Sequence, residues 1–308
     1  MRRPGPVDLM LIATIVIWAF NITVTKYVLT HGFRPLAYGS IRYAAAALLA
    51  AAVALTLERS LAVGGRRSLA LIGAASLFLL GNQFSFVYAL KLGSATTVAL
   101  ILGTTPIFAA IVSSFIGLEE LTGRFWVATA IGFAGVALVA LGSGGNLSSD
   151  LGGDLLAIAL SITWALYSVT IAPLMRRYSP YRISAVVLLV MCVPFVAASS
   201  PQIAAQDYSS LGWLVWVGLA FAIVGPLALT NVLWFTAIDR VGPSRATLFA
   251  NVQPFVAAVF AFLILSEHLH WLQVVGGFTI LVGIVLERRW HTARVRQDEE
   301  EAGAKIAA

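Results

Sequence analysis

Long apolar segments separated by short polar ones dominate the hydropathy pattern of this chain. Each apolar segment is bounded by charged residues or glycine and is long enough to cross a hydrocarbon core of about 30 Å. Ten segments fit this description: 7–29, 36–57, 69–91, 95–117, 125–142, 153–174, 183–199, 212–238, 245–266 and 270–287. The pattern predicts an all-α polytopic membrane protein with ten transmembrane helices.

Distinctive residues also recur in the same order along the chain, which indicates an internal duplication. Four pairs carry the repeat: Trp18 and Trp164, Ala89 and Ala237, Pro106 and Pro254, and Glu119 and Glu267. The first pair is separated by 146 residues and the other three by 148. We expect a first five-helix repeat in 1–145, a second in 146–290 and a disordered cytoplasmic tail in 291–308.

The positive charges orient the predicted helices. If the N-terminus is cytoplasmic, 16 Lys and Arg residues fall in inside segments and only Lys26, Arg34 and Lys91 in outside segments, with Arg42 inside a helix. The positive-inside rule then places both termini in the cytoplasm. Because each repeat has an odd number of spans, the second repeat must be inverted relative to the first, as in many secondary transporters.

Composition supports the membrane assignment and restricts the partners. Hydrophobic residues make up 59% of the chain and charged residues 11%, whereas soluble domains carry roughly 25% charged residues. The net charge of +6 is spread over the cytoplasmic loops, so topology and contact with anionic membrane lipid explain it, and no nucleic-acid partner is expected. The single Cys192 excludes an internal disulfide and a cysteine metal cluster. No enzyme motif, metal site or cofactor site is found, and the oligomeric state stays open.

Several of these features together resemble the EamA-type drug/metabolite transporter superfamily. They are the five-plus-five duplication, Trp18 and Trp164, Pro106 and Pro254, the motifs Glu119-Glu120-Leu121 and Glu267-His268-Leu269, and the glycine-rich fifth helix of each repeat. The resemblance covers about residues 7–287. It implies a secondary transporter of the inner (cytoplasmic) membrane that moves a small organic metabolite, such as an amino acid, by alternating access and as an exporter. The alternative class is a polytopic receptor or an integral-membrane enzyme.

Polar and aromatic side chains near the middle of apolar segments mark a candidate substrate path. Trp18 and Asn21 share one face of the first helix with two threonines, and such a face must turn toward protein or water. Similar positions in the other segments complete the set of expected substrate-binding residues: Trp18, Asn21, Asn82, Tyr88, Trp164, Tyr167, Asn231 and Trp234. The alternative role for these indoles and amides is hydrogen bonding between packed helices.

Three prolines inside apolar segments, Pro106, Pro226 and Pro254, are expected to act as gating hinges. Proline removes a backbone donor and leaves a carbonyl free, and threonine hydroxyls can bond such carbonyls. A fixed kink is the alternative. Glycines in the fifth span of each repeat, including Gly135 and Gly276, predict close helix packing and a scaffolding role.

Two charged residues are candidates for a functional role. Arg42 lies about six residues into the second helix, which is about 9 Å from its outer end. It can pair with a carboxylate on the cargo, bond a helix end, or extend to the outer interface. Glu267 follows the ninth span and is expected to interact with the N-terminus of the helix after it. No span centre carries Asp, Glu, His or Lys, so proton coupling is not indicated.

Overall fold

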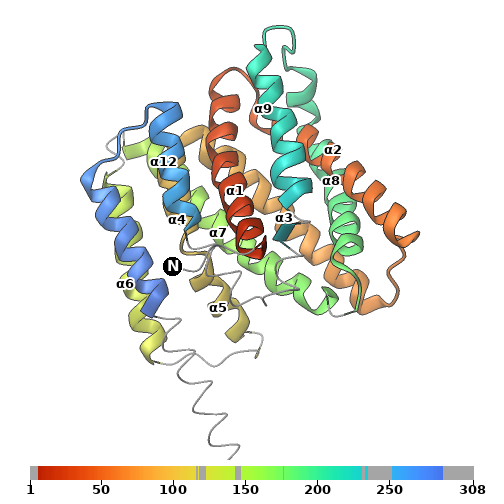
Figure 1. The fold of residues 1–308 in the computed structure, drawn as a ribbon, viewed down its shortest axis with the longest axis horizontal. Helices are drawn as coiled ribbons and strands as arrows, with labels where there is room; N and C mark the ends of the chain where they lie inside the picture. Colours follow the sequence, from red (N-terminus) through yellow and green to blue (C-terminus); the bar gives the residue numbers. More distant parts are fainter. Residues whose placement is uncertain are drawn as a thin grey trace, which may run out of the picture.

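Helices are the only regular secondary structure in the part of the chain that this computed structural model describes, residues 6–115, 117, 123–142, 147–175, 177–230, 233–234 and 252–286. In order they are α1 (Pro6–Thr30), α2 (Pro35–Glu58), α3 (Arg66–Leu92), α4 (Ala95–Leu102), α5 (Thr105–Phe115), α6 (Gly123–Gly142), α7 (Leu147–Met175), α8 (Pro180–Ala204), α9 (Trp213–Ile223), the π-helix η1 (Val224–Leu229), α12 (Gln253–Leu265) and a last helix, Trp271–Leu286 (Figure 1). The predicted all-α fold is confirmed. Six helical stretches within these residues are long and apolar enough to cross a membrane, whereas the count of ten spans stays a prediction.

Large apolar side chains cover the outward faces of these helices. Leu48 on α2, Val193 on α8 and Phe115 on α5 are 68%, 73% and 86% exposed. In water, extended exposure of this kind would favour association or aggregation. Facing hydrocarbon it carries no such penalty, so the exposed apolar surface fits a membrane-embedded bundle.

The helix pairings are reciprocal between the two halves of the chain. By sequence order, α1, α2, α3, α4 with α5, and α6 correspond to α7, α8, α9 with η1, α12 and the last helix. Accordingly, α3 packs on α7 while α9 packs on α1, and α5 packs on α7 while α12 packs on α1. The helices α2 and α4 pack on their own counterparts, α8 and α12. Exchanging the two halves therefore leaves this set of contacts unchanged.

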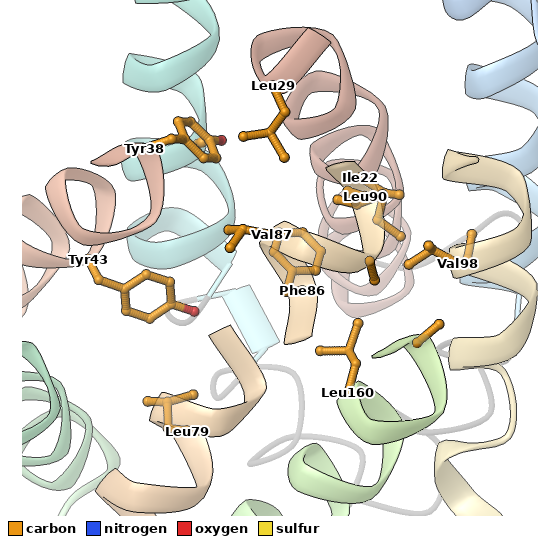
Figure 2. Close-up of a cluster of buried hydrophobic side chains, with 14 of the residues drawn as sticks. Ile22, Leu29, Tyr38, Tyr43, Leu79, Phe86, Val87, Leu90, Val98 and Leu160 are labelled. Carbon is orange, nitrogen blue, oxygen red and sulfur yellow. The ribbon is translucent and has the colours of Figure 1, made fainter. Parts of the chain in front are cut away.

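Apolar side chains from α1, α2, α3, α4 and α7 meet in a buried cluster at the centre of the bundle (Figure 2). Ile22 and Leu29 come from α1, Val98 from α4 and Leu160 from α7, and each is at most 3% exposed. The rings of Tyr38, Tyr43 and Phe86 belong to the same cluster. This cluster holds together helices of both halves.

Polar side chains tie α2 to α8 at both of their ends. At one end the Glu58 carboxylate accepts a salt bridge of 2.9 Å from Arg182 and a short hydrogen bond from the Ser179 hydroxyl. At the other end the Leu36 amide donates to Gln202 Oε1 at 2.9 Å. Because these bonds lie at helix termini, they satisfy backbone and charged groups where hydrocarbon gives way to polar surroundings.

Helix α6 and the last helix pack with their backbones in direct contact, side by side in Figure 1. A Cβ placed on Gly276 would lie 2.6 Å from the carbonyl oxygen of Gly135, and one on Gly283 would lie 2.8 Å from that of Ala128. Only glycine permits so close an approach. The predicted close packing of the fifth spans is confirmed.

We expect Gly276→Ala to destabilise the protein by about 1–3 kcal/mol, because overpacking a close contact costs energy of this order. The matched control is Gly73→Ala in α3, where an added Cβ meets no atom within 4 Å and where alanine favours the helix. Thermal unfolding of the purified proteins in one detergent measures both. Equal melting temperatures for the two variants would show that the backbone contact does not support the fold.

Candidate functional site

Trp18 on α1 lies against the segment that follows η1. Its indole Nε1 donates a hydrogen bond of 2.9 Å to Thr230 Oγ1, and its ring centroid lies 5.1 Å from that of Trp234 at an interplanar angle of 51°. Two of the predicted substrate-binding residues are thus brought together. Thr230 was not among the predicted residues, although a threonine four positions after Pro226 is placed to bond the proline carbonyl, which it does at 2.7 Å.

Trp164 and Tyr167 form a second aromatic pair, on α7. Their ring centroids are 5.5 Å apart, and the Trp164 side chain is 41% exposed. Trp18 is only partly exposed, so the two tryptophans that correspond in the repeat have different surroundings. A large aromatic surface near mid-helix can contact a small apolar or zwitterionic solute.

Two of the three predicted hinge prolines, Pro106 and Pro226, lie at an interruption of regular helix. The fourth apolar stretch is split into α4 and α5 just before Pro106, and α9 changes to a π-helix around Pro226. Pro254 occupies the first turn of α12. A Cβ on Gly103, between α4 and α5, would lie 3.4 Å from Pro254 Cγ. The break between α4 and α5 therefore lies against the first turn of α12.

Threonine hydroxyls bond backbone carbonyls at the break between α4 and α5. Thr104 Oγ1 donates to the Ile101 carbonyl and Thr105 Oγ1 to the Leu102 carbonyl, both at 2.7 Å. Ser161 Oγ from α7 approaches the Ile101 carbonyl at 3.4 Å. Backbone carbonyls held by small hydroxyl side chains at a helix break are groups that a polar ligand can also engage.

A chain of side-chain hydrogen bonds links α2, α3 and α7. Arg42 Nη2 donates to Gln83 Oε1 at 2.8 Å, Gln83 Nε2 donates to Asn82 Oδ1 at 2.8 Å, and Asn82 Nδ2 donates to the Leu160 carbonyl at 3.0 Å. Arg42 is 2% exposed. Its predicted alternative of extending to the outer interface is wrong, because the guanidinium is held inside the bundle by Gln83.

Two other predicted residues lie at helix ends. The Tyr88 hydroxyl accepts a hydrogen bond of 2.9 Å from Gln202 Nε2. Glu267 accepts bonds from the backbone amides of Ala95 and Thr96 at 2.8 and 3.0 Å and from the Thr96 hydroxyl at 2.8 Å. The expectation that Glu267 serves the helix after it is therefore wrong: its carboxylate caps the N-terminus of α4, in the other half of the chain, where the helix dipole favours negative charge.

The amide oxygen of Asn21 is buried and accepts no hydrogen bond within the described part of the chain. Asn231 lies outside the described residues. Among the described residues, no group of three or more His, Cys, Asp or Glu side chains could hold a metal ion. The candidate site therefore consists of aromatic rings, amides, freed carbonyls and one buried guanidinium.

The profile of the EamA-like transporter family matches this chain twice, at residues 5–141 and 151–287. Together the two matches cover most of the chain. They coincide with the two halves inferred from the recurring residues.

Similar proteins are named as transporters. The chain is 25% identical over 203 residues to the uncharacterized transporter YyaM of Bacillus subtilis, covering 65% of this chain and 66% of that one. It is 30% identical over 193 residues to the uncharacterized inner membrane transporter YedA of Escherichia coli K12, covering 61% and 60%. A probable terminal-alkyne amino-acid exporter of Streptantibioticus cattleyicolor is 26% identical over 207 residues, covering 66% and 67%. The matched part thus spans about two thirds or less of the length of these relatives.

A solved crystal structure has a similar fold. It superposes with a TM-score of 0.62 at 17% sequence identity and covers 93% of this chain and 99% of its own. The arrangement of helices is therefore one already observed in a protein of nearly the same extent.

The capping role of Glu267 gives a test of the contact between the halves. We expect Glu267→Ala to lower the free energy of unfolding by about 1–3 kcal/mol, since it removes a charged acceptor from two amides and a hydroxyl. Glu267→Gln, which keeps one oxygen acceptor, should have an intermediate effect. Thermal unfolding in detergent measures both, with the exposed His268→Ala as control. If Glu267→Ala melts at the same temperature as His268→Ala, the cap contributes nothing.

Proposed function

The chain belongs to the EamA-like transporter family, and on that basis we propose that it moves a small organic metabolite across the cytoplasmic membrane by alternating access, as an exporter. In this proposal the segments 1–145 and 146–290 are inverted repeats of five spans each. Both termini and the tail 291–308 lie in the cytoplasm, as the distribution of Lys and Arg favours. The observation that carries the proposal is a difference between corresponding contacts in the two halves.

The corresponding contacts are those of Trp18 and Trp164. Trp18 donates to Thr230, and the positions that correspond to these two residues are Trp164 and Asn82, at offsets of 146 and 148. Asn82 bonds Leu160, Thr163 and Gln83 instead. The pair Trp18 and Thr230 is thus hydrogen-bonded, whereas the corresponding pair, Trp164 and Asn82, is not. Alternating access by exchange of conformations between repeats requires such a difference in any one state, so this asymmetry supports the proposal.

Prolines near the middle of three spans supply the moving parts in this proposal. Pro106, Pro226 and Pro254 act as hinges, and half-helices swing about them. The contact between Gly103 and Pro254 supports this role, because movement at one of these positions must displace the other. The small number of backbone bonds at a break lowers the cost of such movement.

The cargo in this proposal meets the aromatic side chains Trp18, Trp164, Tyr167 and Trp234, with Asn21 and Asn231 as polar contacts. Asn82 and Tyr88 are assigned to helix packing, since their polar groups bond other helices. The name of the Streptantibioticus relative, a probable amino-acid exporter, supports an amino acid or a similar solute and the outward direction.

Transport by the purified protein tests the proposal directly. Proteoliposomes are supplied with a panel of labelled amino acids and metabolites, with and without a pH gradient. We expect Trp18→Ala and Trp164→Ala each to reduce transport at least about tenfold at matched expression, since losing an indole contact of about 1.4 kcal/mol has that effect. Trp213→Ala, at an indole that is 72% exposed at the start of α9, is the control and should transport normally.

Wild-type rates in both variants would remove the tryptophans from the site. Ligand binding without movement of any member of the panel would favour a receptor, and chemical turnover of a lipid would favour an enzyme.

Reciprocal labelling tests the alternating mechanism. Single cysteines replace Ser94, at the start of α4, and Ser244, which lies outside the described residues and, by sequence, near the inner entrance of the ninth span. Cys192→Ser is the background. As saturating cargo shifts the population of states, labelling at one position should rise while the other falls. A cysteine at the exposed Ser210 should not respond. Parallel changes at Ser94 and Ser244 would contradict alternating access.

A further inference from the structure

Arg42 is a buried cation without an anionic partner in the described part of the chain. Arg182, by contrast, forms a salt bridge with Glu58, at the ends of α8 and α2. Arg42 is 2% exposed, donates from Nη2 to the neutral Gln83 side chain, and has a buried Nε without a hydrogen-bond partner. Burying a charge in this position costs free energy unless the charge is paired. The residues around Arg42 therefore bear on its functional role.

Three aromatic rings surround the guanidinium. Its Cζ lies 5.2 Å from the centroid of Tyr38, 5.1 Å from that of Tyr43 and 5.2 Å from that of Phe86. Figure 2 shows these rings, with Tyr43 extending from α2 toward α3. Cation–π contacts attract the positive charge but leave it unneutralised. The cage therefore stabilises Arg42 in its charged form and leaves it able to attract an anion.

The guanidinium is also held in a fixed orientation. Asn82 directs the Gln83 amide by accepting from its nitrogen, so that Gln83 Oε1 faces Arg42. Only one of the terminal nitrogens is used in this contact. The planar fork of arginine can offer two parallel donors to a carboxylate, and Arg42 Nε, which has no partner in the described part of the chain, is a donor left for an anion.

A second buried polar atom without a partner among the described residues is the amide oxygen of Asn21. Asn21 lies about as far along α1 from the loop 31–34 as Arg42 lies along α2. The Thr25 hydroxyl and the Tyr38 hydroxyl share a hydrogen bond of 3.1 Å. Asn21 lies one helical turn from Thr25, and Arg42 one turn from Tyr38, both on the side away from that loop. The Asn21 oxygen is buried without a donor. This part of the bundle thus offers a free donor on α2 and a free acceptor on α1, the helix that also carries Trp18.

We propose that Arg42 is the anion-binding residue of the transport site and that it takes the carboxylate of a small carboxylate-bearing cargo. The inference rests on the proposed transport function and names its class of substrate. The guanidinium is occluded in this structure among Tyr38, Tyr43 and Phe86, so the carboxylate reaches it in a state in which these rings move apart. Gln83 positions Arg42 and does not itself bind cargo.

Substitution of Gln83 by glutamate separates this role from a purely structural one. Gln83→Glu places a carboxylate where Gln83 Oε1 now accepts from Arg42, and so supplies an internal competitor for the cargo. The buried cation gains an ionic partner, while the hydrogen bond from Gln83 Nε2 to Asn82 Oδ1 is lost, so we expect a stability close to that of wild type, which thermal unfolding in detergent checks. If Arg42 only holds helices together, Gln83→Glu strengthens that contact and leaves binding unchanged. Gln202→Glu, an equivalent change at the end of α8, is the matched control.

The experiment measures ligand binding to the purified protein in detergent and flux in proteoliposomes. The probes are matched pairs of glycine, leucine, phenylalanine and glutamine with their primary amides, which lack the carboxylate. In wild type and in Gln202→Glu, the best carboxylate should bind at least about tenfold more tightly than its amide, as loss of a charged hydrogen bond implies. The preference should disappear in Arg42→Gln and Gln83→Glu, and partly return in Arg42→Lys.

The outcomes distinguish this inference from the proposed function. Equal binding of acids and amides in wild type, no binding of any acid, or an unchanged preference in Arg42→Gln or Gln83→Glu would each overturn the role of Arg42. Equal flux of the acids and their amides would overturn the role of Arg42 and leave the proposed transport function supported. Carboxylate-selective binding that depends on Arg42, without any flux, would support the anion site and overturn transport.

Discussion

Hydrocarbon provides no hydrogen-bonding partner, and this constraint governs every polar feature of the bundle. Where proline removes a backbone donor, a nearby hydroxyl replaces it, as Thr105 Oγ1 does for the Leu102 carbonyl, which lies four residues before Pro106. Where an amide lies in the interior, it is bonded to a neighbouring helix, as Asn82 is to α7. In the part of the chain that the structure describes, the buried side-chain atoms without partners, among them the Asn21 oxygen and the Arg42 Nε, are therefore exceptions with a physical cost.

Two kinds of contact hold the helices of the bundle together. Helix α6 and the last helix meet through glycines with backbone atoms in contact, so backbone atoms rather than flexible side chains set the distance between these two helices. The inner helices meet through aromatic rings and hydroxyls, such as Trp18 with Thr230, whose bonds can be exchanged for others. Rigid glycine contacts at the periphery and exchangeable polar contacts at the centre are the combination that a moving site on a stable frame requires.

Local sequence pattern predicted the helices well because apolar length and charge boundaries depend only on neighbouring residues. The glycine contacts were also predictable, since few other roles suit several glycines in one apolar span. Glu267 could not be assigned correctly, because its partners, the amides of α4, are 171 and 172 residues away and any helix N-terminus attracts a carboxylate. The burial of Arg42 depends on Phe86 and Gln83 from α3, so position along α2 alone could not decide between burial and extension to the interface.

The cap on α4 also bears on the order in which the chain can complete its structure. Ribosomal synthesis delivers α4 long before Glu267, yet the Ala95 and Thr96 amides are bonded by that carboxylate. The Arg34 amide likewise bonds Gln206, and the Leu36 amide bonds Gln202. Backbone amides at helix N-termini of the first half are thus bonded by side chains of the second half. Until the second half is synthesised, the amides at these helix starts lack the protein partners that they have in the complete fold, so the first half alone cannot reach its final set of hydrogen bonds.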